Sequence, residues 1–301
     1  MPHIALVTAA VARGSDEDLA PLQDALQALE AEVSIVDWDD ASVDWARFDA
    51  AVLRSCWDYT ERVVEFLIWA ERVSRLTRLI NPFEVVRWNT DKHYLAELAE
   101  AGVAIVPSRF VEPGDDAARA LESFLANHAD AAEIVVKPAI GAGSRDTRRH
   151  DRARTDAALA HMRRLLDAGR SVLLQPYLER VDEAGETALI HFDGQFSHAI
   201  RKGPLLRPDE EATSELFAPE QIEAREADAG ERALARQVLA AMPFKVELAY
   251  ARIDLIRSAA GEPVLLELEL TEPSLFFAHA EGSAIRFARC LLERCRSAAA
   301  D

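Results

Sequence analysis

The sequence of 301 residues is poor in lysine and carries a large excess of acid. Its 34 basic residues include only four lysines: Lys92, Lys137, Lys202 and Lys245. In a chain that otherwise uses arginine, a lysine is a candidate for a position that needs a compact point charge, and we expect only Lys245 to be incidental. The net charge of −18 argues against nucleic acid or an anionic membrane surface as a partner.

Cysteine and long apolar runs are also scarce. Cys56, Cys290 and Cys295 have no metal-ligand spacing, and their odd number argues against a disulfide framework. The histidines show no HxH or HxxxH pairing. No apolar run reaches about 18 residues, and no basic segment precedes a long apolar core at the N-terminus. We therefore expect a cytoplasmic protein that has no membrane partner.

The first part of the chain alternates strand and helix patterns. Strands are predicted over 3–8, 32–36 and 49–54, and a leucine-faced helix begins near residue 19. This alternation predicts an α/β lobe with a parallel sheet covered by helices. Ligands bind at the carboxyl ends of such strands, which draws attention to the polar and aromatic cluster that follows the third strand, Arg54-Ser55-Cys56-Trp57-Asp58-Tyr59. The alternative is a loop with a packed tryptophan and a surface ion pair.

The remaining segments suggest two further lobes. Helices are predicted over about 61–76 and 91–101, strands over 133–137 and 171–175, and a hairpin over 186–201 around an Asp-Gly turn. Residues 205–230 are polar and aperiodic up to a helix near Glu231, and so long a loop is usually functional or mobile. The predicted domains are an N-terminal lobe, a central lobe and a C-terminal lobe, over 1–85, 86–180 and 181–301.

Two acidic segments near the C-terminus, 251–255 and 264–274, alternate apolar and polar residues as strands do. Glu267 and Glu269 then project from one face, and three leucines cover the opposite, core-facing side: Leu266, Leu268 and Leu270. If the two strands are neighbours, Asp254 joins the glutamates. Such a cluster is costly without a cation, and its hard oxygen ligands suit Mg²⁺. The alternative is an amphipathic strand whose acids face water.

A glycine-rich turn follows the buried strand that ends at Lys137, in the stretch 135–147. It has neither the GxxxxGK[ST] nor the GxGxxG pattern, so those two nucleotide fingerprints are absent. Gly141 and Gly143 would allow backbone N–H groups to approach phosphate oxygens, and Lys137 would neutralise an α or β phosphate.

This order of motifs resembles the ATP-grasp superfamily of carboxylate–amine ligases. The resemblance covers residues 1–296 and implies the ATP-grasp fold, with a parallel-sheet domain before two lobes that enclose ATP. It implies that the nucleotide contacts Lys92, Lys137, Gly141, Gly143, Ser144, Gln175, Tyr177 and Leu178. The same resemblance implies a ribose-binding glutamate at Glu186, with Glu183 as the competing candidate.

The resemblance also implies the chemistry. A substrate carboxylate attacks the γ-phosphate of ATP, and an amine then displaces phosphate from the acylphosphate, forming a C–N bond. Mg²⁺, with Mn²⁺ as an alternative, would be held by Asp254, Glu267 and Glu269. The cations that would stabilise the transferred phosphate are Arg252, Lys202 and Arg201. The alternatives are that Arg201 and Lys202 are a basic strand end and that Arg252 is a structural partner of Asp254.

One departure makes it unsafe to transfer a relative's substrate. Many relatives have Glu-x-Asn followed by a small residue, Pro and Gly, whereas this chain has Glu-x-Glu-Leu-Thr-Glu-Pro-Ser from Glu267 to Ser274. We expect a small amino-acid-like substrate that contacts Arg54, Trp57, Asp58, Tyr59, Glu272 and Ser274. The alternatives are a ligase that extends a peptide or protein and a catalytically silent ATP-binding regulator. A homodimer is the default assembly.

Four stretches are similar to the branch of the superfamily that closes O-ureido-D-serine to D-cycloserine in antibiotic biosynthesis: 54–59, 197–204, 216–220 and 270–274. This similarity implies that one molecule supplies both the carboxylate and the nitrogen, so that no second amine site is needed. Asp58 or Glu272 would hold the α-ammonium group, and Arg252 the carboxylate. Chance similarity within a large superfamily is the alternative.

Overall fold

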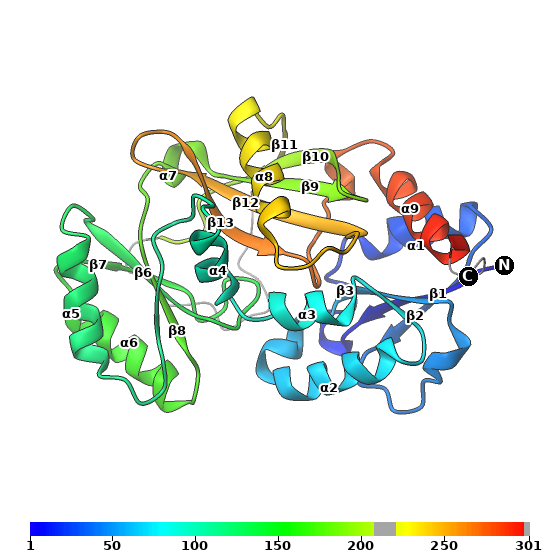
Figure 1. Ribbon diagram of the computed structural model, residues 1–301, viewed down its shortest axis with the longest axis horizontal. Coiled ribbons are helices and arrows are strands. Elements are labelled where there is room, and N and C mark those ends of the chain that lie inside the picture. Colours follow the sequence, from blue (N-terminus) through cyan, green and yellow to red (C-terminus); the bar gives the residue numbers. More distant parts are fainter. Residues whose placement is uncertain (208–220, 298–301) are drawn as a thin grey trace.

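A computed structural model describes residues 1–207 and 221–297, which form three sheets (Figure 1). The stretch 216–220, one of the four that carried the branch similarity, lies outside the described residues, as does much of the 205–230 loop. None of the helices in the described ranges is long and apolar enough to cross a membrane.

The N-terminal sheet is parallel, as predicted, because its strands are joined by helical crossovers. Its strand order is β2 (Glu32–Asp37), β1 (His3–Thr8), β3 (Ala50–Ser55) and β4 (Arg78–Ile80). Apolar residues cover both faces of β1 and β3. One face packs against α1 (Leu19–Ala28) and α9 (Ser283–Ser297), and the other against α2 (Val63–Ser74).

The second sheet is antiparallel and forms the lobe on the left of Figure 1. Its order is β5 (Arg109–Val111), β8 (Val172–Pro176), β6 (Glu133–Pro138) and β7 (Arg148–Asp151). Two helices cover one face, α5 (Ala117–Asn127) and α6 (Thr155–Asp167). Because strand residues alternate between faces, Ile134 and Val136 join this core while Val135 and Lys137 face the other way, into a cavity.

The third sheet is also antiparallel. Its order is β11 (Ile222–Arg225), β10 (Gln195–Lys202), β9 (Glu186–Phe192), β12 (Tyr250–Arg257) and β13 (Pro263–Glu269). The predicted hairpin is confirmed: Asp193 and Gly194 both have left-handed φ, which the tight turn between β9 and β10 requires. Two helices accompany this sheet, α7 (Val181–Ala184) and α8 (Ala229–Ala241). A capping box formed by Asp228 and Glu231 fixes the start of α8.

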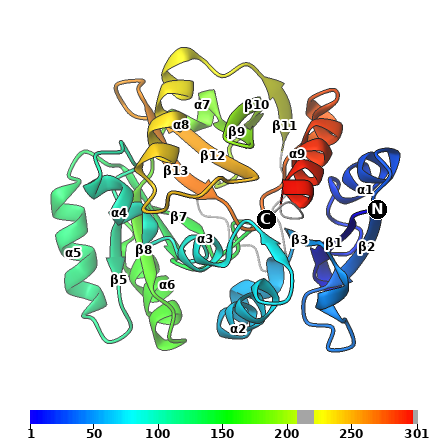
Figure 2. The ribbon, with the colours of Figure 1, turned by 45° about the vertical axis from the view of Figure 1, so that its right-hand side comes forward.

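Side chains from the connecting segment fasten the third sheet to the rest of the chain. This segment contains α3 (Phe83–Asn89), which the sequence did not predict, and α4 (Tyr94–Glu100). The Asn89 side chain donates to the Leu268 carbonyl at 2.7 Å and accepts from the Leu270 N–H at 2.6 Å. Figure 2 shows the second and N-terminal sheets on either side, with the third sheet above and between them. The end of β13 is therefore fixed where the three sheets approach one another.

Candidate active site

A cavity lies between the three sheets. The N-terminal sheet contributes Trp57 and Tyr59, which follow β3, and the second sheet contributes Lys137 together with the glycine-rich loop. The third sheet contributes acids from β12 and β13. The site residues predicted from sequence that line this cavity are Trp57, Tyr59, Lys92, Lys137, Gly141, Gly143, Ser144, Gln175, Tyr177, Leu178, Glu186, Lys202, Arg252, Asp254, Glu267, Glu269, Glu272 and Ser274.

Lys137 is a buried cation whose ammonium group faces this cavity. Burial, reinforced by the charge of Lys92, lowers the pKa of Lys137 to about 8. Among the described residues, no carboxylate forms an ion pair with it. A buried ammonium group without an anionic partner is costly. The geometry therefore favours an anionic ligand at this point.

The glycine-rich loop has the backbone shape that an anion site needs. Gly143 and Ser144 have left-handed φ of 61° and 60°, and such consecutive turns direct N–H groups into a concavity. At Gly141 a Cβ atom would approach the Pro138 ring to 3.0 Å, so the tight approach favours glycine. The Gly141 carbonyl accepts a hydrogen bond of 2.7 Å from the Lys92 ammonium, which ties the loop to the segment before α4.

Lys92 also neutralises the first acid of β13. Its Nζ lies 2.9 Å from Oε1 of Glu267. Burial opposes the charge of Glu267, but the ammonium groups of Lys92 and Lys137 outweigh burial and lower the pKa of this carboxyl. Glu267 is thus held as a carboxylate by an ion pair with Lys92 and by the charge of Lys137.

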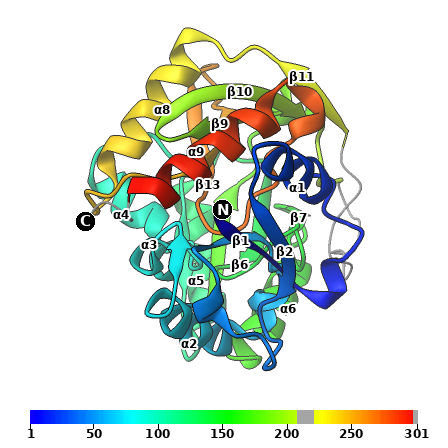
Figure 3. The ribbon, with the colours of Figure 1, turned by 90° about the vertical axis from the view of Figure 1, so that its right-hand side faces the viewer.

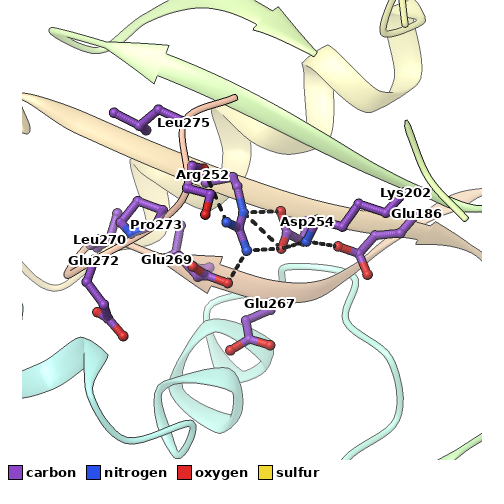
Figure 4. Close-up of polar contacts among 12 residues, drawn as sticks. Glu186, Lys202, Arg252, Asp254, Glu267, Glu269, Leu270, Glu272, Pro273 and Leu275 are labelled. Atoms are coloured by element: carbon purple, nitrogen blue, oxygen red, sulfur yellow. Dashed lines mark hydrogen bonds and ion pairs between the residues drawn. The ribbon is translucent and has the colours of Figure 1, made fainter. Parts of the chain in front are cut away.

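Arg252 bridges the other two acids. Its guanidinium donates to Asp254 through Nε at 2.9 Å and through Nη2 at 2.9 Å, and it pairs with Glu269 (Figure 4). Burial would raise the pKa of Asp254, but the charges of Arg252 and Lys202 outweigh it and lower that pKa. At Glu269 the positive charge of Arg252 is too weak to offset burial, so burial raises the pKa of this carboxyl to about 7. The arrangement leaves Glu269 short of positive charge.

Lys202 and Glu186 are cross-strand neighbours on β10 and β9. The Lys202 Nζ lies 2.5 Å from Glu186 Oε1 and 2.9 Å from Asp254 Oδ2. Burial raises the pKa of Glu186 to about 7, although the lysine beside it acts in the opposite direction. The lysine therefore joins the acid of β12 to the glutamate at the start of β9.

One part of the predicted strand geometry was wrong. The register of β12 with β13 shifts between Asp254 and Leu255, so that Asp254 pairs with Glu267 but Leu255 pairs with Leu265. This irregularity turns Leu266 toward the cavity and places Leu265 in the core instead. The predicted placement of Glu267 and Glu269 on the cavity side is unaffected.

The far end of the cavity has an apolar, aromatic lining suited to a flat ring. Gln175, Tyr177 and Leu178 lie at the end of β8 and just beyond it. The Gln175 side chain donates to Ser108 Oγ at 2.9 Å, and the Arg149 guanidinium stacks over the Tyr177 ring at 3.6 Å. These contacts fix the positions of the side chains that would flank a base.

At the opposite end, Trp57 and Tyr59 face the segment that follows β13. Trp57 Nε1 donates to the main-chain carbonyl of Glu272 at 3.0 Å. The Glu272 side chain is 8% exposed, and burial together with the nearby charge of Glu269 raises its pKa to about 8. Ser274 also lines this end.

Two predicted substrate residues do not line the cavity. Arg54 is fully buried behind the segment after β13, where its guanidinium donates to the Pro273 carbonyl at 3.0 Å. Asp58 turns toward α2 and accepts from Trp38 Nε1 at 2.8 Å, with Arg62 at 3.5 Å. The contacts of Asp58 therefore match the alternative given for this loop, a surface ion pair beside packed tryptophan.

Two more predicted residues point away from the cavity. Arg201 donates to the main-chain carbonyls of Ala184 at 2.8 Å and Glu183 at 3.0 Å, so it holds the end of α7. The Glu183 side chain is exposed outside the cavity. Because successive side chains of a strand point to opposite faces, Lys202 points into the cavity and its neighbour Arg201 does not.

The sequence did not identify Asp18, Asn89 or Arg145 as site residues. The Asp18 carboxylate accepts a hydrogen bond from the backbone N–H of Leu275, in the segment after β13. Asn89 lines the cavity. Arg145 lies in the glycine-rich loop and forms an ion pair with Glu61 of the N-terminal lobe. A basic residue in the glycine-rich loop was a readable signal, whereas Asp18 offered none beyond a polar residue before a helix.

The residues fit a nucleotide and a divalent cation. Asp254, Glu267 and Glu269 are hard oxygen donors on two paired strands, as Mg²⁺ prefers. In the described ranges no group of three or more acidic, histidine or cysteine side chains forms a ready metal centre, and each of the three acids is paired with a lysine or an arginine. The charge shortage at Glu269 is what a bound cation would relieve.

Solved structures show the class of fold. The D-alanine–D-alanine ligase of Bacillus anthracis matches over 99% of this chain and 98% of its own, with a TM-score of 0.68 and 14% identity. The expected ATP-grasp fold is thereby confirmed. A crystal structure of D-cycloserine synthetase DcsG matches over 97% of this chain and 99% of its own, with a TM-score of 0.92 and 45% identity.

Sequence comparison gives the particular family. The family described as D-cycloserine synthetase DcsG, N-terminal domain, matches residues 4–81. The cycloserine biosynthesis protein DcsG of Streptomyces lavendulae is 46% identical over 300 residues, which cover 98% of this chain and 100% of that protein. The chain belongs to the D-cycloserine synthetase family of ATP-grasp ligases. It is accordingly an ATP-dependent ligase that forms C–N bonds, as the sequence predicted.

Proposed function

We propose that the protein converts O-ureido-D-serine to D-cycloserine with ATP. The observation that carries this proposal is the single cavity that runs from Lys137 and the glycine-rich loop to Glu272 and Ser274. A nucleotide phosphate and a small acid would meet within it. We also propose the predicted division into lobes at residues 85 and 180, because the cavity then lies between all three.

ATP would lie with its base between Tyr177 and Leu178 and its phosphates at the glycine-rich loop. Lys137 would receive a phosphate, because its buried ammonium group faces the cavity and forms no ion pair within residues 1–207 and 221–297. Lys92 would hold the loop and a phosphate together, since it already contacts the Gly141 carbonyl. Glu186 is the better candidate for the ribose, because Glu183 lies outside the cavity.

Mg²⁺ would be held by Asp254, Glu267 and Glu269. When bound, the cation would neutralise the phosphate oxygens during transfer. Arg252 pairs with Asp254 and Glu269, and Lys202 pairs with Asp254, so both cations lie beside the acids that would hold the metal and could contact the phosphates. Their charges would then stabilise the transferred phosphoryl group.

The reaction has two bond-forming steps. The substrate carboxylate attacks the γ-phosphorus of ATP, which gives an acylphosphate and ADP. The O-linked nitrogen of the same molecule then attacks the acyl carbon, inorganic phosphate leaves and a five-membered ring closes. Hydrolysis removes the carbamoyl group from that nitrogen as carbon dioxide and ammonia. Because the nucleophile is tethered to the acyl group, its effective concentration is high without a second amine site.

The test is to incubate the protein with Mg²⁺, ATP and O-ureido-D-serine alone, and to measure phosphate and ring product. We expect equal amounts of both. The matched control omits the acid, and a second arm adds a separate amine. If phosphate appears only with the separate amine, the protein is an intermolecular ligase; if ATP binds without turnover for any acid and amine, it is a silent ATP-binding regulator.

A further inference from the structure

The carboxylates that line the cavity differ in whether they form an ion pair with a basic residue. Four of them pair with a lysine or an arginine: Glu186, Asp254, Glu267 and Glu269. Glu272 lines the same cavity and is 8% exposed, yet among the described residues no lysine, arginine or histidine forms an ion pair with it. Figure 4 shows Glu272 apart from the dashed network that joins Glu186, Asp254 and Glu269 to Lys202 and Arg252. A buried, unpaired carboxyl group that faces a cavity marks a place for a cationic ligand.

The main chain around Glu272 is fixed on both sides. Its own carbonyl accepts from Trp57 Nε1 at 3.0 Å, and the Thr271 carbonyl accepts from the Tyr250 hydroxyl at 2.7 Å. The Pro273 carbonyl accepts from Arg54 at 3.0 Å. The backbone therefore holds Glu272 at the wall of the cavity.

The neighbourhood of Glu272 supplies a polar group, and the positive charge of Lys92 acts on it only weakly, without an ion pair between the two in the described residues. The Tyr59 hydroxyl beside it favours the ionised carboxyl, but burial and the charge of Glu269 act more strongly in the other direction. An ammonium group would provide both the missing charge and hydrogen-bond donors. A neutral ligand would leave the carboxyl group as costly as before.

The position also suits an α-amino acid. Arg252 donates to the Ser274 carbonyl at 3.2 Å, so this guanidinium and Glu272 flank the same short segment. In an α-amino acid the ammonium and carboxylate groups sit on one carbon atom. A carboxylate directed toward Arg252 and the phosphates thus places its ammonium group on the side of Glu272.

We propose that Glu272, assisted by Tyr59, is the subsite for the α-ammonium group of the substrate. This inference rests on the proposed function in taking an amino acid as the ligand. It makes Glu272 a specificity-determining residue, because an acid without the amino group gains nothing there. The chain's departure from the usual superfamily sequence after Glu269 is then the feature that selects amino acids.

The experiment compares two ligands and two variants. The ligands are O-ureido-D-serine and the same acid with hydrogen in place of the α-amino group. The variants are Glu272→Gln, which is nearly isosteric, and Glu262→Gln, an exposed control in the turn between β12 and β13. Binding is measured by calorimetry with ADP and Mg²⁺ present, and ring product and phosphate are measured with ATP.

We expect wild type and Glu262→Gln to bind the amino acid roughly 10- to 150-fold more tightly than its des-amino analogue, the range for a hydrogen bond to a charged group. Glu272→Gln should lose most of this preference while its affinity for ADP and for the analogue is unchanged. Tyr59→Phe should lose part of it. This pattern distinguishes recognition of the ammonium group from a structural role of Glu272. If the role were structural, the variant would bind both ligands more weakly by the same factor.

The outcomes also separate the subsite from the proposed function. If ring product forms but Glu272→Gln weakens both ligands equally, the subsite proposal is wrong and the function stands. If no ring product forms but the ammonium preference exists and disappears in Glu272→Gln, the cyclisation is wrong and the subsite stands. If wild type shows no preference between the ligands, the subsite proposal is overturned without any variant.

Discussion

Asp18 accepts a 2.5 Å hydrogen bond from the backbone N–H of Leu275, although 257 residues separate the two. The same carboxylate accepts from the N–H groups of Phe276 at 3.0 Å and Phe277 at 2.8 Å. Arg54 lies 3.8 Å from it and donates to the Pro273 carbonyl. One buried acid at the start of α1 thus shapes the turn that carries the substrate end of the cavity.

Asp18→Asn should weaken substrate binding without affecting the nucleotide. An amide oxygen replaces two carboxylate oxygens, so at least one of the three N–H groups loses its acceptor, at a cost of about 1.5–3 kcal/mol. We expect the KM for the acid to rise roughly tenfold or more and the KM for ATP to stay constant. Steady-state kinetics with each substrate varied in turn measures the difference.

The control for this prediction is Asp24→Asn, the same change at an exposed position on the same helix. It should leave both KM values unchanged. Equal increases in the two KM values of Asp18→Asn would mean that Asp18 supports the whole fold rather than the substrate turn.

Glu267→Gln should stop ATP turnover while the fold persists. The change is nearly isosteric, but it removes a charge that faces both Lys92 and Lys137 and would hold the divalent cation. We expect phosphate release to fall well beyond tenfold, a loss above about 1.4 kcal/mol of transition-state stabilisation. A variant that retains more than about a tenth of the wild-type rate, with an unchanged melting temperature, would exclude Glu267 as a ligand.

The lysines should separate into two classes. Lys137→Ala removes an ammonium group that forms no ion pair with any described residue, so ATP affinity should fall by about 1.5–3 kcal/mol with little loss of stability. Lys92→Ala should weaken ATP binding and also lower the free energy of unfolding, because it removes the ion-pair partner of the buried carboxylate of Glu267. Lys245→Ala, at an exposed position, is the control. Calorimetry with ATP and urea unfolding give the two quantities; equal effects at all three positions would contradict the assignment.

Two buried histidines should contribute a loss of stability as the pH drops below about 6.5, the usual histidine value. The buried carboxyls of Glu186, Glu269 and Glu272, whose pKa values are raised, act in the opposite direction, so the histidine contribution is measured as a difference between variants. Burial lowers the pKa of His161 and of His191 to about 4 each. At these two positions the unfolded chain takes up protons between pH 6.5 and 4 that the folded chain does not, and the stability that the neutral histidines contribute is complete above this window. Each histidine adds a slope of about 1.4 kcal/mol per pH unit. Urea unfolding of wild type and of His191→Gln across this range should differ by about one such slope; identical pH dependence of the two would mean that His191 is protonated in the folded state.

The sequence was informative wherever the signal was periodic. The alternation along β13 placed Glu267 and Glu269 on the cavity side, because side chains of a strand alternate regardless of its partners. The same rule failed at Leu266, since a register shift against β12 depends on two strands at once. A single strand's pattern contains no information about such an irregularity.

Side-chain direction after a strand was harder to predict. Arg54 and Trp57 both lie at the end of β3, yet the first is buried behind the substrate segment and the second faces the cavity. Asp18 gave no signal because its partners are main-chain N–H groups of a distant segment, and any sequence there supplies them. Position along the chain predicts the neighbourhood of a site, but tertiary packing decides which side chains enter it.

The helix α9 lies against α1 at the opposite end of the chain (Figure 3). Its Phe287 and Leu291 share one core with Ile4 and Leu22. During synthesis at about 5–20 residues per second, β1 would wait roughly a quarter of a minute to a minute for this helix to be translated. One apolar face of the first sheet stays uncovered for that time, which makes the nascent chain a natural client for chaperones even though the finished enzyme is not.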